Sequence, residues 1–309
     1  RMLNLLTTIH HRLGEVQARH LHTPLPELSK AYRVSAVHAM LALEGGALDP
    51  LPVAELVSRP LAGPDQAALE VVNTHRALEL LPGLDPHAIG DLRQAHGVLM
   101  HGLALDAGHF RTGPMDVLYG DPPPLRRAPA DDLPVQVAEL LHIVENDDTP
   151  PVIVSCMLHF ALVYLRPFSA GNGRLARLWQ RRVLMRHWPV FAYLPVEAFI
   201  HRTRPAYHAA LEYADRQGDC GGFITYMLER IDEALAELLA MPDPVRSGAE
   251  RVTGFLQLAP RRWFHRKDYR ARYPELSTAT ASRDLRDAVA QGRLVREGGG
   301  RNARYMPTG

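Results

Sequence analysis

The residues best suited to chemistry lie in one short segment between two apolar stretches of helical periodicity. A glycine turn, Gly171-Asn172-Gly173, is followed by Arg174 and, three residues later, by Arg177. Glycines allow left-handed backbone, and the free amides at a helix start attract anions. Arginines there oppose the helix macrodipole, at a cost of up to about 1 kcal/mol each when exposed. The arrangement predicts a polyanion site, although a bare Gly-x-Gly turn is a weak signal that also fits a simple helix connection.

The complete run is more specific than its glycine turn. It reads Arg166-Pro-Phe-Ser-Ala-Gly-Asn-Gly-Arg-Leu-Ala-Arg177. This resembles the signature of Fic (Fido) domain proteins, His-x-Phe-x-Asp/Glu-Gly-Asn-Gly-Arg-x-x-Arg. The positions that match are Phe168, Gly171, Asn172, Gly173, Arg174 and Arg177. Segments Gly108–Pro114 and Glu70–Leu80 also resemble parts of that family, so the resemblance extends over residues 30–240.

The resemblance implies an activity and a ligand. Fic domains transfer a nucleotide monophosphate, usually AMP from ATP, to a Ser, Thr or Tyr hydroxyl of a target protein that docks at a flap. By the same resemblance, Phe168 belongs to the nucleotide site, and the Gly171–Gly173 amides with Asn172 would hold the α- and β-phosphates. Arg174 and Arg177 would hold the β- and γ-phosphates.

Two departures from the signature affect the chemistry. Arg166 stands where the family has its catalytic histidine, and a guanidinium cannot accept a proton from a hydroxyl. Ala170 stands where the family has the carboxylate that binds Mg²⁺, so Mg²⁺ would bind weakly, and only together with a nucleotide. We therefore expect AMP transfer to be weakened or lost. Arg166 either adds a third cation for phosphate or points into solvent.

A substitute base is the open alternative. His109, His159 and His201 lie in the same predicted domain. Most histidines are structural, and His159 on an apolar helix face is expected to be a hydrogen-bonded core residue.

Glu44 ends a predicted helix, where the macrodipole disfavours a carboxylate. The run Leu43-Glu44-Gly45 resembles the inhibitory helix of many Fic proteins, whose glutamate pairs with the second arginine of the signature and blocks the γ-phosphate site. Arg177 would then be its partner. Met40 departs from the family's usual Ser or Thr, and the alternative is an ordinary surface glutamate.

The elements that must position these residues are mostly helical by pattern. Helices are predicted over Leu28–Glu44, Pro64–Leu81, Pro86–His101, Leu133–Glu145, Pro151–Leu165, Asn172–His187, Pro205–Arg216 and Phe223–Leu239. Within Arg111–Pro124, which is too rich in proline for a helix, Met115–Tyr119 is expected to form one strand of a flap. The predicted fold is mainly α: a Fic helical core with a short β-hairpin flap, an N-terminal helical region that resembles the inhibitory helix, and a C-terminal winged helix (α+β).

The last 64 residues form a separate electrostatic region. Arg246–Gly309 carries 14 basic and 6 acidic residues, a net charge of +8, whereas the preceding residues carry 21 basic and 28 acidic, a net of −7. A short helix from Phe264, a second helix Ser277–Gln291 and a glycine-turn hairpin follow in the order of a winged helix-turn-helix. The expected DNA contacts are Thr280, Arg283 and Arg286 in the major groove, with Arg301 and Arg304 on phosphates. Winged helices also serve as protein-docking or dimerisation modules.

Composition narrows the remaining possibilities. The chain has 309 residues, 2 Cys and only two lysines, Lys30 and Lys267, so no phosphate-loop Gly-Lys-Ser/Thr is possible. The few cysteines, the short apolar stretches and the lack of a visible signal peptide predict a cytoplasmic protein with no membrane partner. We expect four parts: an N-terminal helical region (1–95), a Fic domain (96–240), a linker (241–250) and a winged helix (251–309).

Three functions follow from these observations. The first is a Fic-fold protein that binds ATP or another nucleotide, has weakened or lost AMP transfer, and regulates through DNA. The second is an active nucleotidyltransferase with a non-standard base. The third is a Fic scaffold that serves only DNA binding. A homodimer is compatible with each.

Overall fold

The computed structural model describes residues 1–19, 21–46, 48–59, 65–113, 129–146, 148–241, 247–258, 262–273, 276–300 and 303–308. The chain divides into two units, Arg1–Met241 and Pro242–Gly309. The predicted flap strand at Met115–Tyr119 lies outside the described residues. No helix in the described ranges has the length and apolar character needed to cross a membrane.

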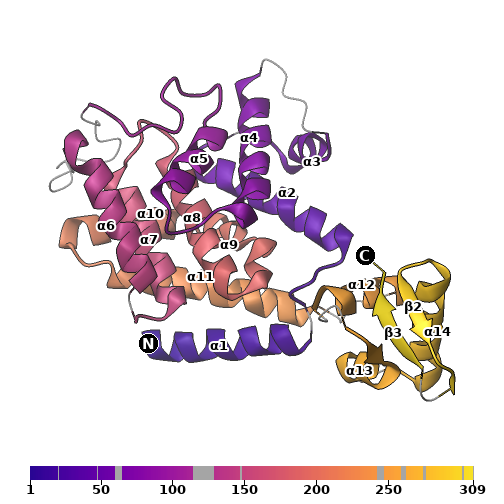
Figure 1. The fold of residues 1–309 in the computed structure, drawn as a ribbon. Helices are drawn as coiled ribbons and strands as arrows, with labels where there is room; N and C mark the ends of the chain where they lie inside the picture. Colours follow the sequence, from indigo (N-terminus) through magenta and orange to yellow (C-terminus); the bar gives the residue numbers. More distant parts are fainter. Residues whose placement is uncertain are drawn as a thin grey trace. The chain divides into compact units, whose positions relative to one another are not determined.

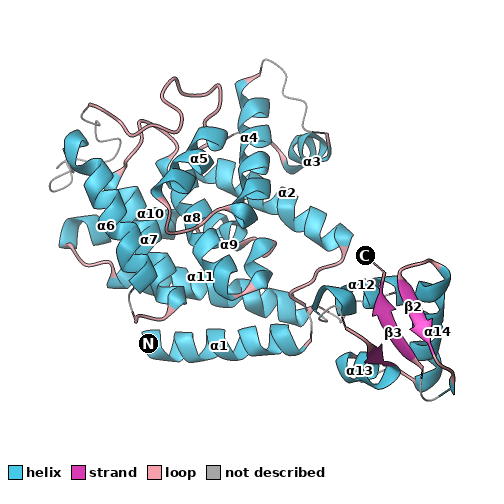
Figure 2. Cartoon of the chain, in the orientation of Figure 1, coloured by secondary structure: helices cyan, strands magenta, loops and turns pink. Residues whose placement is uncertain are grey.

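In its described parts, the first unit is built from α-helices joined by loops and short 3₁₀ turns (Figures 1 and 2). Its helices are α1 (Met2–Ala18), α2 (Pro26–Leu43), α3 (Pro50–Ser58), α4 (Gln66–Leu80), α5 (Ile89–Leu99), α6 (Leu133–Asn146), α7 (Pro151–Leu165), α8 (Asn172–His187), α9 (Val196–Arg202), α10 (Arg204–Gln217) and α11 (Gly221–Ala240).

The centre of this unit is the pair α7 and α8, which pack directly against each other. Trp179 on α8 is fully buried, and its Nε1 donates a hydrogen bond to Pro86 O at 3.0 Å. Arg181 on the same helix is buried in an ion pair with Glu197 of α9. Because α8 is anchored on several sides, its first turn has a fixed position relative to α2, α4 and α5.

Helices α1, α3 and α9 lie outside the ranges that the sequence pattern predicts to be helical. The first of these helices buries Leu6, Ile9, Leu13 and Val16 at helical spacing and lies along α11 (Figure 1). That periodicity was visible in the sequence. The other two helices have 9 and 7 residues, which is too short for a clear period.

Two predicted helices begin later than expected because acidic side chains organise their starts. The side chain of Asp65 caps α4 by accepting from the N–H groups of Ala67 and Ala68. The carboxylate of Asp91 accepts from Asp85 N at 2.6 Å and helps to keep residues 85–88 in a turn before α5. Predicted elements and observed helices otherwise overlap along most of their length.

The second unit combines helices with a small antiparallel sheet (Figure 2). Its elements are α12 (Gly248–Leu258), β1 (Phe264–His265), α13 (Arg266–Arg272), α14 (Thr278–Ala290), β2 (Leu294–Glu297) and β3 (Arg304–Pro307). The strand order is β1-β3-β2, with Tyr305 opposite both Phe264 and Arg296. Helix α12 was not predicted, and it begins inside the range expected to be a linker.

The core of the second unit contains a buried charge pair. Arg251 on α12 donates from Nε to Asp284 Oδ2 of α14 at 2.8 Å, and from Nη2 to Asp284 Oδ1 at 2.9 Å. The hydroxyl of Tyr269 on α13 donates to the same carboxylate at 3.0 Å. These three side chains connect the three helices beneath the sheet, among Phe255, Leu285 and their apolar neighbours.

Candidate functional site

The segment 166–171 joins α7 to α8 and has left-handed backbone at both ends. Arg166 follows α7 with a φ of 44°, and Gly171 precedes α8 with a φ of 73°. Arg166 is the only non-glycine residue with positive φ among the described ones, a conformation that costs roughly 1–2 kcal/mol. Arg111 stabilises it, because its Nε donates to Arg166 O at 2.8 Å and its N–H donates to Pro167 O at 3.0 Å.

Asn172, the first residue of α8, stabilises this loop through its side chain. Its Oδ1 accepts from Phe168 N at 3.0 Å, and its Nδ2 donates to Phe168 O at 2.8 Å. The ring of Phe168 is fully buried. The matching motif residues Phe168 and Asn172 therefore shape the loop, and their contact with a nucleotide stays a prediction.

His96 on α5 fixes the same loop from the other side. Its ring stacks on Phe168 with centroids 3.7 Å apart. Gly108 N donates to Nδ1 at 2.9 Å, so the neutral ring carries its proton on Nε2, which donates to Ala170 O at 3.0 Å. Burial lowers the pKa of His96 to about 4, so the ring stays neutral at physiological pH.

Arg177 meets Glu44 in an ion pair across the site. Its Nη2 donates to Glu44 Oε1 at 2.6 Å and to Met40 O at 3.3 Å, and its Nη1 lies 3.5 Å from the Tyr207 hydroxyl. The Arg177 side chain is 2% exposed. The expected contact between Glu44 and Arg177 is thus present, while an inhibitory role for Glu44 stays a prediction.

The carboxylate of Glu44 also lies against the bare backbone of Gly173. A Cβ at position 173 would overlap Glu44 Oε1 and come within 3.3 Å of Arg177 Nη1. Glycine here leaves room for an acidic group at the start of α8, next to the cation of Arg177. The anion site expected from the sequence therefore holds a carboxylate of the chain itself.

The ionisation of Glu44 follows from this environment. Burial acts to raise its pKa, but the charge of Arg177 and the hydrogen bond from it act the other way and prevail, so the pKa is lowered. Glu44 is therefore negatively charged at neutral pH. Its charge compensates that of the buried Arg177 guanidinium.

Arg174 is buried with much of its hydrogen-bonding capacity unused. It is 6% exposed, and its Nη2 lies 4.0 Å from Glu70 Oε1 and 3.6 Å from Met100 Sδ. Its Nε and Nη1 have no hydrogen-bond partner among the described residues. A buried donor without a partner costs about 1–3 kcal/mol, and a bound anion would remove that cost.

Met100 fills part of the space beside Arg174. A Cβ built on Gly171 would lie 2.5 Å from Met100 Sδ. The thioether of Met100 therefore packs against Gly171, as the carboxylate of Glu44 packs against Gly173. Met100 and Glu44 thus lie beside the two glycines of the turn, next to the two arginines.

The position that would bind Mg²⁺ carries no ligand. Ala170 has only a methyl group, and the adjacent Ser169 donates from Oγ to Asp106 Oδ1 at 2.7 Å. No group of three or more His, Cys, Asp or Glu that could hold a metal occurs within the described ranges. The side chains present do not form a metal site, so we derive no step that passes through Mg²⁺.

Among the described residues, none of the three histidines considered as substitute bases forms a hydrogen bond or ring contact with the loop 166–171. His159 is fully buried, with Nδ1 2.7 Å from Gln180 Oε1 and Nε2 2.9 Å from the Tyr207 hydroxyl, which confirms it as a core residue. His201 packs edge-on against His38, and His109 is exposed. Burial lowers the pKa of His159 to about 3.

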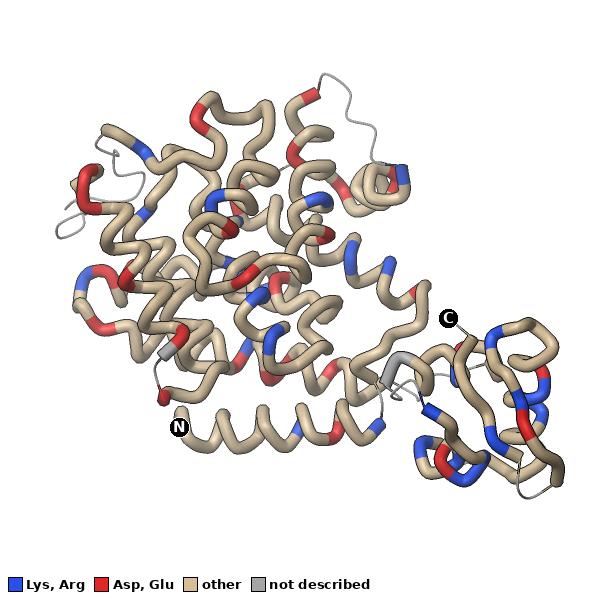
Figure 3. The backbone as a smooth tube through the Cα atoms, viewed as in Figure 1, with Lys and Arg blue, Asp and Glu red and all other residues tan. Residues whose placement is uncertain are grey.

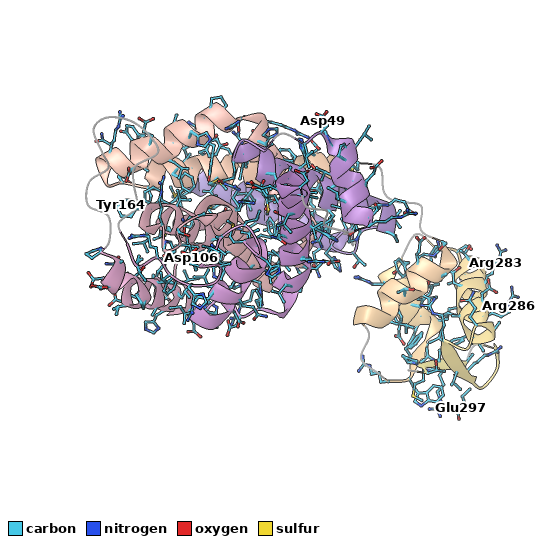
Figure 4. The ribbon with its side chains drawn as sticks, turned by 90° about the horizontal axis from the view of Figure 1, so that it is seen from above. Asp49, Asp106, Tyr164, Arg283, Arg286 and Glu297 are labelled. Atoms are coloured by element: carbon cyan, nitrogen blue, oxygen red, sulfur yellow. The ribbon has the colours of Figure 1, made fainter. Side chains whose placement is uncertain are left out.

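In the second unit, Arg283 and Arg286 project from the exposed face of α14 (Figure 4). Ser277 caps this helix by accepting from Thr280 N at 3.0 Å, and its Oγ lies 2.9 Å from Thr280 Oγ1. Lys and Arg recur along α13 and α14 (Figure 3). The predicted major-groove residues therefore share one helix.

The two arginines expected to contact phosphates from the hairpin, Arg301 and Arg304, are placed differently from those on α14. Arg304 donates from Nη2 to Glu297 Oε2 at 2.9 Å on the neighbouring strand, and its guanidinium lies 4.8 Å from the centroid of the Trp263 ring. It is thus partly neutralised within its own unit. Arg301 lies outside the described residues.

Sequence reasoning did not single out His96, Met100 or Tyr207. Each of them reaches the motif from another helix, so no local spacing linked it to Gly171–Arg177. His96 lies within a predicted helix. The one feature of the sequence that could have pointed to it is its position on the apolar side of that helix.

Comparisons with known proteins agree with this site. A family model described as Fic/DOC family matches residues 86–184. The chain is 28% identical over 237 residues to protein adenylyltransferase Fic of Nematostella vectensis, with 73% of this chain and 53% of that protein covered. It is 27% identical over 244 residues to protein adenylyltransferase fic-1 of Caenorhabditis briggsae, with 75% and 46% covered. The chain spans about half the length of these curated relatives.

Solved structures show the same relationship over more of the chain. A Fic family protein from Desulfovibrio desulfuricans matches with a TM-score of 0.73 at 28% identity, over 100% of this chain and 96% of that one. Fic-1 from C. elegans matches with a TM-score of 0.58 at 20% identity, over 75% of this chain and 72% of that one, which is a likeness of fold. The fold is a mainly helical Fic fold with a small three-stranded antiparallel sheet near the C-terminus. Taken with the motif geometry, these matches place residues 86–184 in the Fic/DOC family, within a chain that is similar to a Fic family protein over its whole length.

Proposed function

We propose that the chain binds the phosphates of a nucleotide, ATP or a similar compound, at Gly171–Arg177 and has little or no AMP-transfer activity. The observation that carries this proposal is the carboxylate of Glu44, seated between Gly173 and Arg177. A site that accepts one anionic oxygen group beside a buried guanidinium has the chemistry to accept a phosphate oxygen there. The unused donors of Arg174 supply further capacity next to it.

The expected loss of turnover depends on Arg166. Transfer of AMP requires the target hydroxyl to lose its proton as it attacks the α-phosphorus and pyrophosphate leaves. A guanidinium remains protonated throughout the physiological range and cannot accept that proton. His96 is the histidine hydrogen-bonded to this loop, and both of its ring nitrogens are already used. Without general-base assistance the rate is expected to fall about 10²- to 10⁴-fold.

Glu44 is proposed to be an inhibitory carboxylate. It occupies the position that a terminal phosphate would take beside Arg177, and ionised Glu44 would repel a phosphate at that point. The chain is similar to protein adenylyltransferases, so AMP is the nucleotide fragment that we propose it would transfer. Mg²⁺, if it accompanies the nucleotide, would rest on phosphate oxygens and water.

A label-transfer experiment tests the proposal. The chain is incubated with ATP labelled at the α-phosphate, in the Glu44→Ala background so that the site is open, with Arg174→Ala as the control. We expect label no higher than in the control, and a gain of protein-bound label when Arg166→His and Ala170→Asp are combined. Strong labelling by the chain that keeps Arg166 would support the alternative of an active enzyme with another base.

Nucleotide binding itself is tested by thermal melting. A ligand that binds only the folded state raises the melting temperature, so ATP should stabilise the Glu44→Ala chain and not its Arg174→Ala derivative. No shift in either chain would favour the alternative in which the Fic domain is only a scaffold.

We further propose that the second unit binds DNA as a winged helix. The supporting observation is α14, which is capped at Ser277 and presents Arg283 and Arg286 on its exposed face. A helix of this kind fits the major groove, with its exposed arginines directed at base edges or phosphates. The combined protein would be a DNA-associated regulator that responds to a phosphate ligand.

A further inference from the structure

A large surface cavity lies beside α4 and α5, apart from the nucleotide motif. Its volume is about 580 Å³, and its lining comes from α4, α5 and the segment that follows α5. Neither the motif arginines nor Glu44 contribute to it. Small-molecule sites typically have volumes of roughly 300–1,000 Å³, so the cavity has the size for a sugar phosphate or a mononucleotide.

The charged groups that line the cavity are basic. Arg76 of α4 and Arg93 of α5 both contribute, together with His101, and the lining contains no Asp or Glu. In the described part of the chain, neither arginine forms an ion pair. Glu79, one turn beyond Arg76 on α4, faces His75 at 3.5 Å instead. Among the residues that the structure describes, the two guanidinium groups therefore have no ion-pair partner.

Arg93 is held in a fixed orientation at the cavity wall. Its Nε donates to Gly108 O at 2.9 Å, and its guanidinium lies 5.8 Å from the centroid of the Phe110 ring. The contact is possible because Gly108 approaches α5 closely: a Cβ there would lie 3.2 Å from Arg93 O. Within the described ranges the Nη groups of Arg93 have no hydrogen-bond partner, and a fixed guanidinium loses less entropy when it binds a ligand.

The lining of the cavity includes a buried polar side chain, Asn73, with an acceptor that has no partner among the described residues. Asn73 is 1% exposed, and its Nδ2 donates to His101 O at 2.7 Å. That bond fixes the orientation of the amide, and Oδ1 has no hydrogen-bond partner among the described residues. Buried acceptors are nearly always paired, so an unmet one beneath a cavity is a sign that a donor group belongs there.

We propose that this cavity is a second ligand site, which binds a small phosphate ester. The phosphate dianion would neutralise Arg76 and Arg93 together, and a hydroxyl of the ester would donate to Asn73 Oδ1 once the groups that cover this atom move. Phosphate suits two guanidinium groups because its oxygens can accept from both at once. The proposal does not depend on nucleotide binding at Gly171–Arg177.

Calorimetric titration with ribose 5-phosphate, and with inorganic phosphate, tests this site. The titrations use the full chain with Arg174→Ala. This change removes a buried cation of the motif that could otherwise bind the same probe. We expect saturable binding at millimolar concentration or below, weakened about tenfold or more by Arg76→Glu, since one charge-assisted hydrogen bond and its Coulombic attraction are lost. Arg76 is exposed, so this change leaves the core intact.

The matched control is Arg186→Glu, which makes the same charge change at an exposed position on α8. Equal loss of affinity in the two variants would mean non-specific attraction and overturn the proposal. The absence of saturable heat with either probe would also overturn it. A change of oligomeric state in Arg76→Glu, with ribose 5-phosphate binding unaltered, would show instead that the cavity is a protein contact.

Discussion

Glu44 and Arg177 determine what the motif can bind at the level of single residues. The guanidinium of Arg177 is buried, and its strongest contact is the 2.6 Å hydrogen bond to Glu44. A free phosphate must compete with a carboxylate that is tethered to the same protein and therefore always nearby. If the motif binds a nucleotide as proposed, its affinity is set by the difference between the two anions, and not by the arginines alone.

The change Glu44→Ala is expected to strengthen ATP binding about tenfold or more, which lies within the usual range of coupling between competing ligands. Without a ligand the same change should lower the free energy of unfolding by about 1–3 kcal/mol, because Arg177 loses its partner. Calorimetric titration with ATP and thermal melting measure the two effects. Glu55→Ala, an exposed glutamate on α3, is the control. Unaltered ATP affinity in Glu44→Ala would contradict an inhibitory role.

The buried histidines predict an acid-sensitive fold. The unfolded chain takes up protons on histidine near pH 6.5, whereas the pKa values of His96 and His159 are lowered by burial to about 4 and about 3. Between these values the unfolded state holds more protons, so the free energy of unfolding falls as the pH drops from 6.5 towards 4. Each histidine contributes a slope of at most about 1.4 kcal/mol per pH unit.

Urea unfolding followed by circular dichroism at pH 5 and pH 7 measures that slope. The variant His159→Gln should reduce the pH dependence, because it removes one group that titrates only in the unfolded state. His11→Gln, at an exposed position on α1, should leave it unaltered. An equal pH dependence in all three chains would exclude His159 as its source.

The sequence made some of these residues predictable and others not. The positions from Phe168 to Arg177 follow from one continuous run, and the pairing of Glu44 with Arg177 followed from a resemblance. The stacking of His96 on Phe168 and the intrusion of Met100 beside Gly171 depend on how α5 packs against α8. No local pattern encodes that packing.

Among the structural elements, most helices with a long apolar period were predicted, with α1 as the exception, and the short helices α3 and α9 were not. Helices α2, α7, α8 and α11 overlap their predicted ranges closely, since each has 15 or more residues. The strand β1 has two residues and arises only because Tyr305 of β3 offers it a partner. Such an element has no independent signal in the sequence.

The buried pair between α12 and α14 is expected to stabilise the second unit. Asp284→Ala would leave Arg251 without its carboxylate and Tyr269 without its acceptor, a loss of about 3–5 kcal/mol. Hydrogen exchange of the full chain should then show faster exchange in α12 and α14. Exchange in α7 and α8 serves as the internal reference. The matched control is Asp287→Ala, an exposed acid on the same helix, and equal exchange in both variants would show that the buried pair contributes nothing.

At the scale of the whole molecule, charge is divided between two units of different kind. The net charge of +8 belongs to Arg246–Gly309, whereas the residues before it sum to −7. Much of the basic charge in the second unit is exposed, but Arg251 and Arg304 are already paired with Asp284 and Glu297. The net charge already subtracts Asp284 and Glu297, so these two ion pairs do not reduce it further. The cations that could contact DNA phosphates are the other exposed basic residues of this unit.

The number of basic residues that contact phosphates determines how the proposed DNA binding depends on salt concentration. Each phosphate neutralised by a basic residue adds about −0.9 to the slope of log affinity against log salt concentration, so a few contacts give a moderate slope. Arg283→Ala combined with Arg286→Ala should weaken binding to duplex DNA and make that slope shallower by about 1–2 if the two side chains contact phosphates. If they contact base edges, affinity should fall by about 1–3 kcal/mol per residue while the slope is kept. Fluorescence anisotropy of labelled duplexes over a salt series separates these cases.

The control for this experiment combines Arg186→Ala with Arg216→Ala, which removes two exposed arginines of the first unit. Binding that is unaffected by the α14 pair, or lost equally in the control, would mean that α14 is not the DNA-contacting helix.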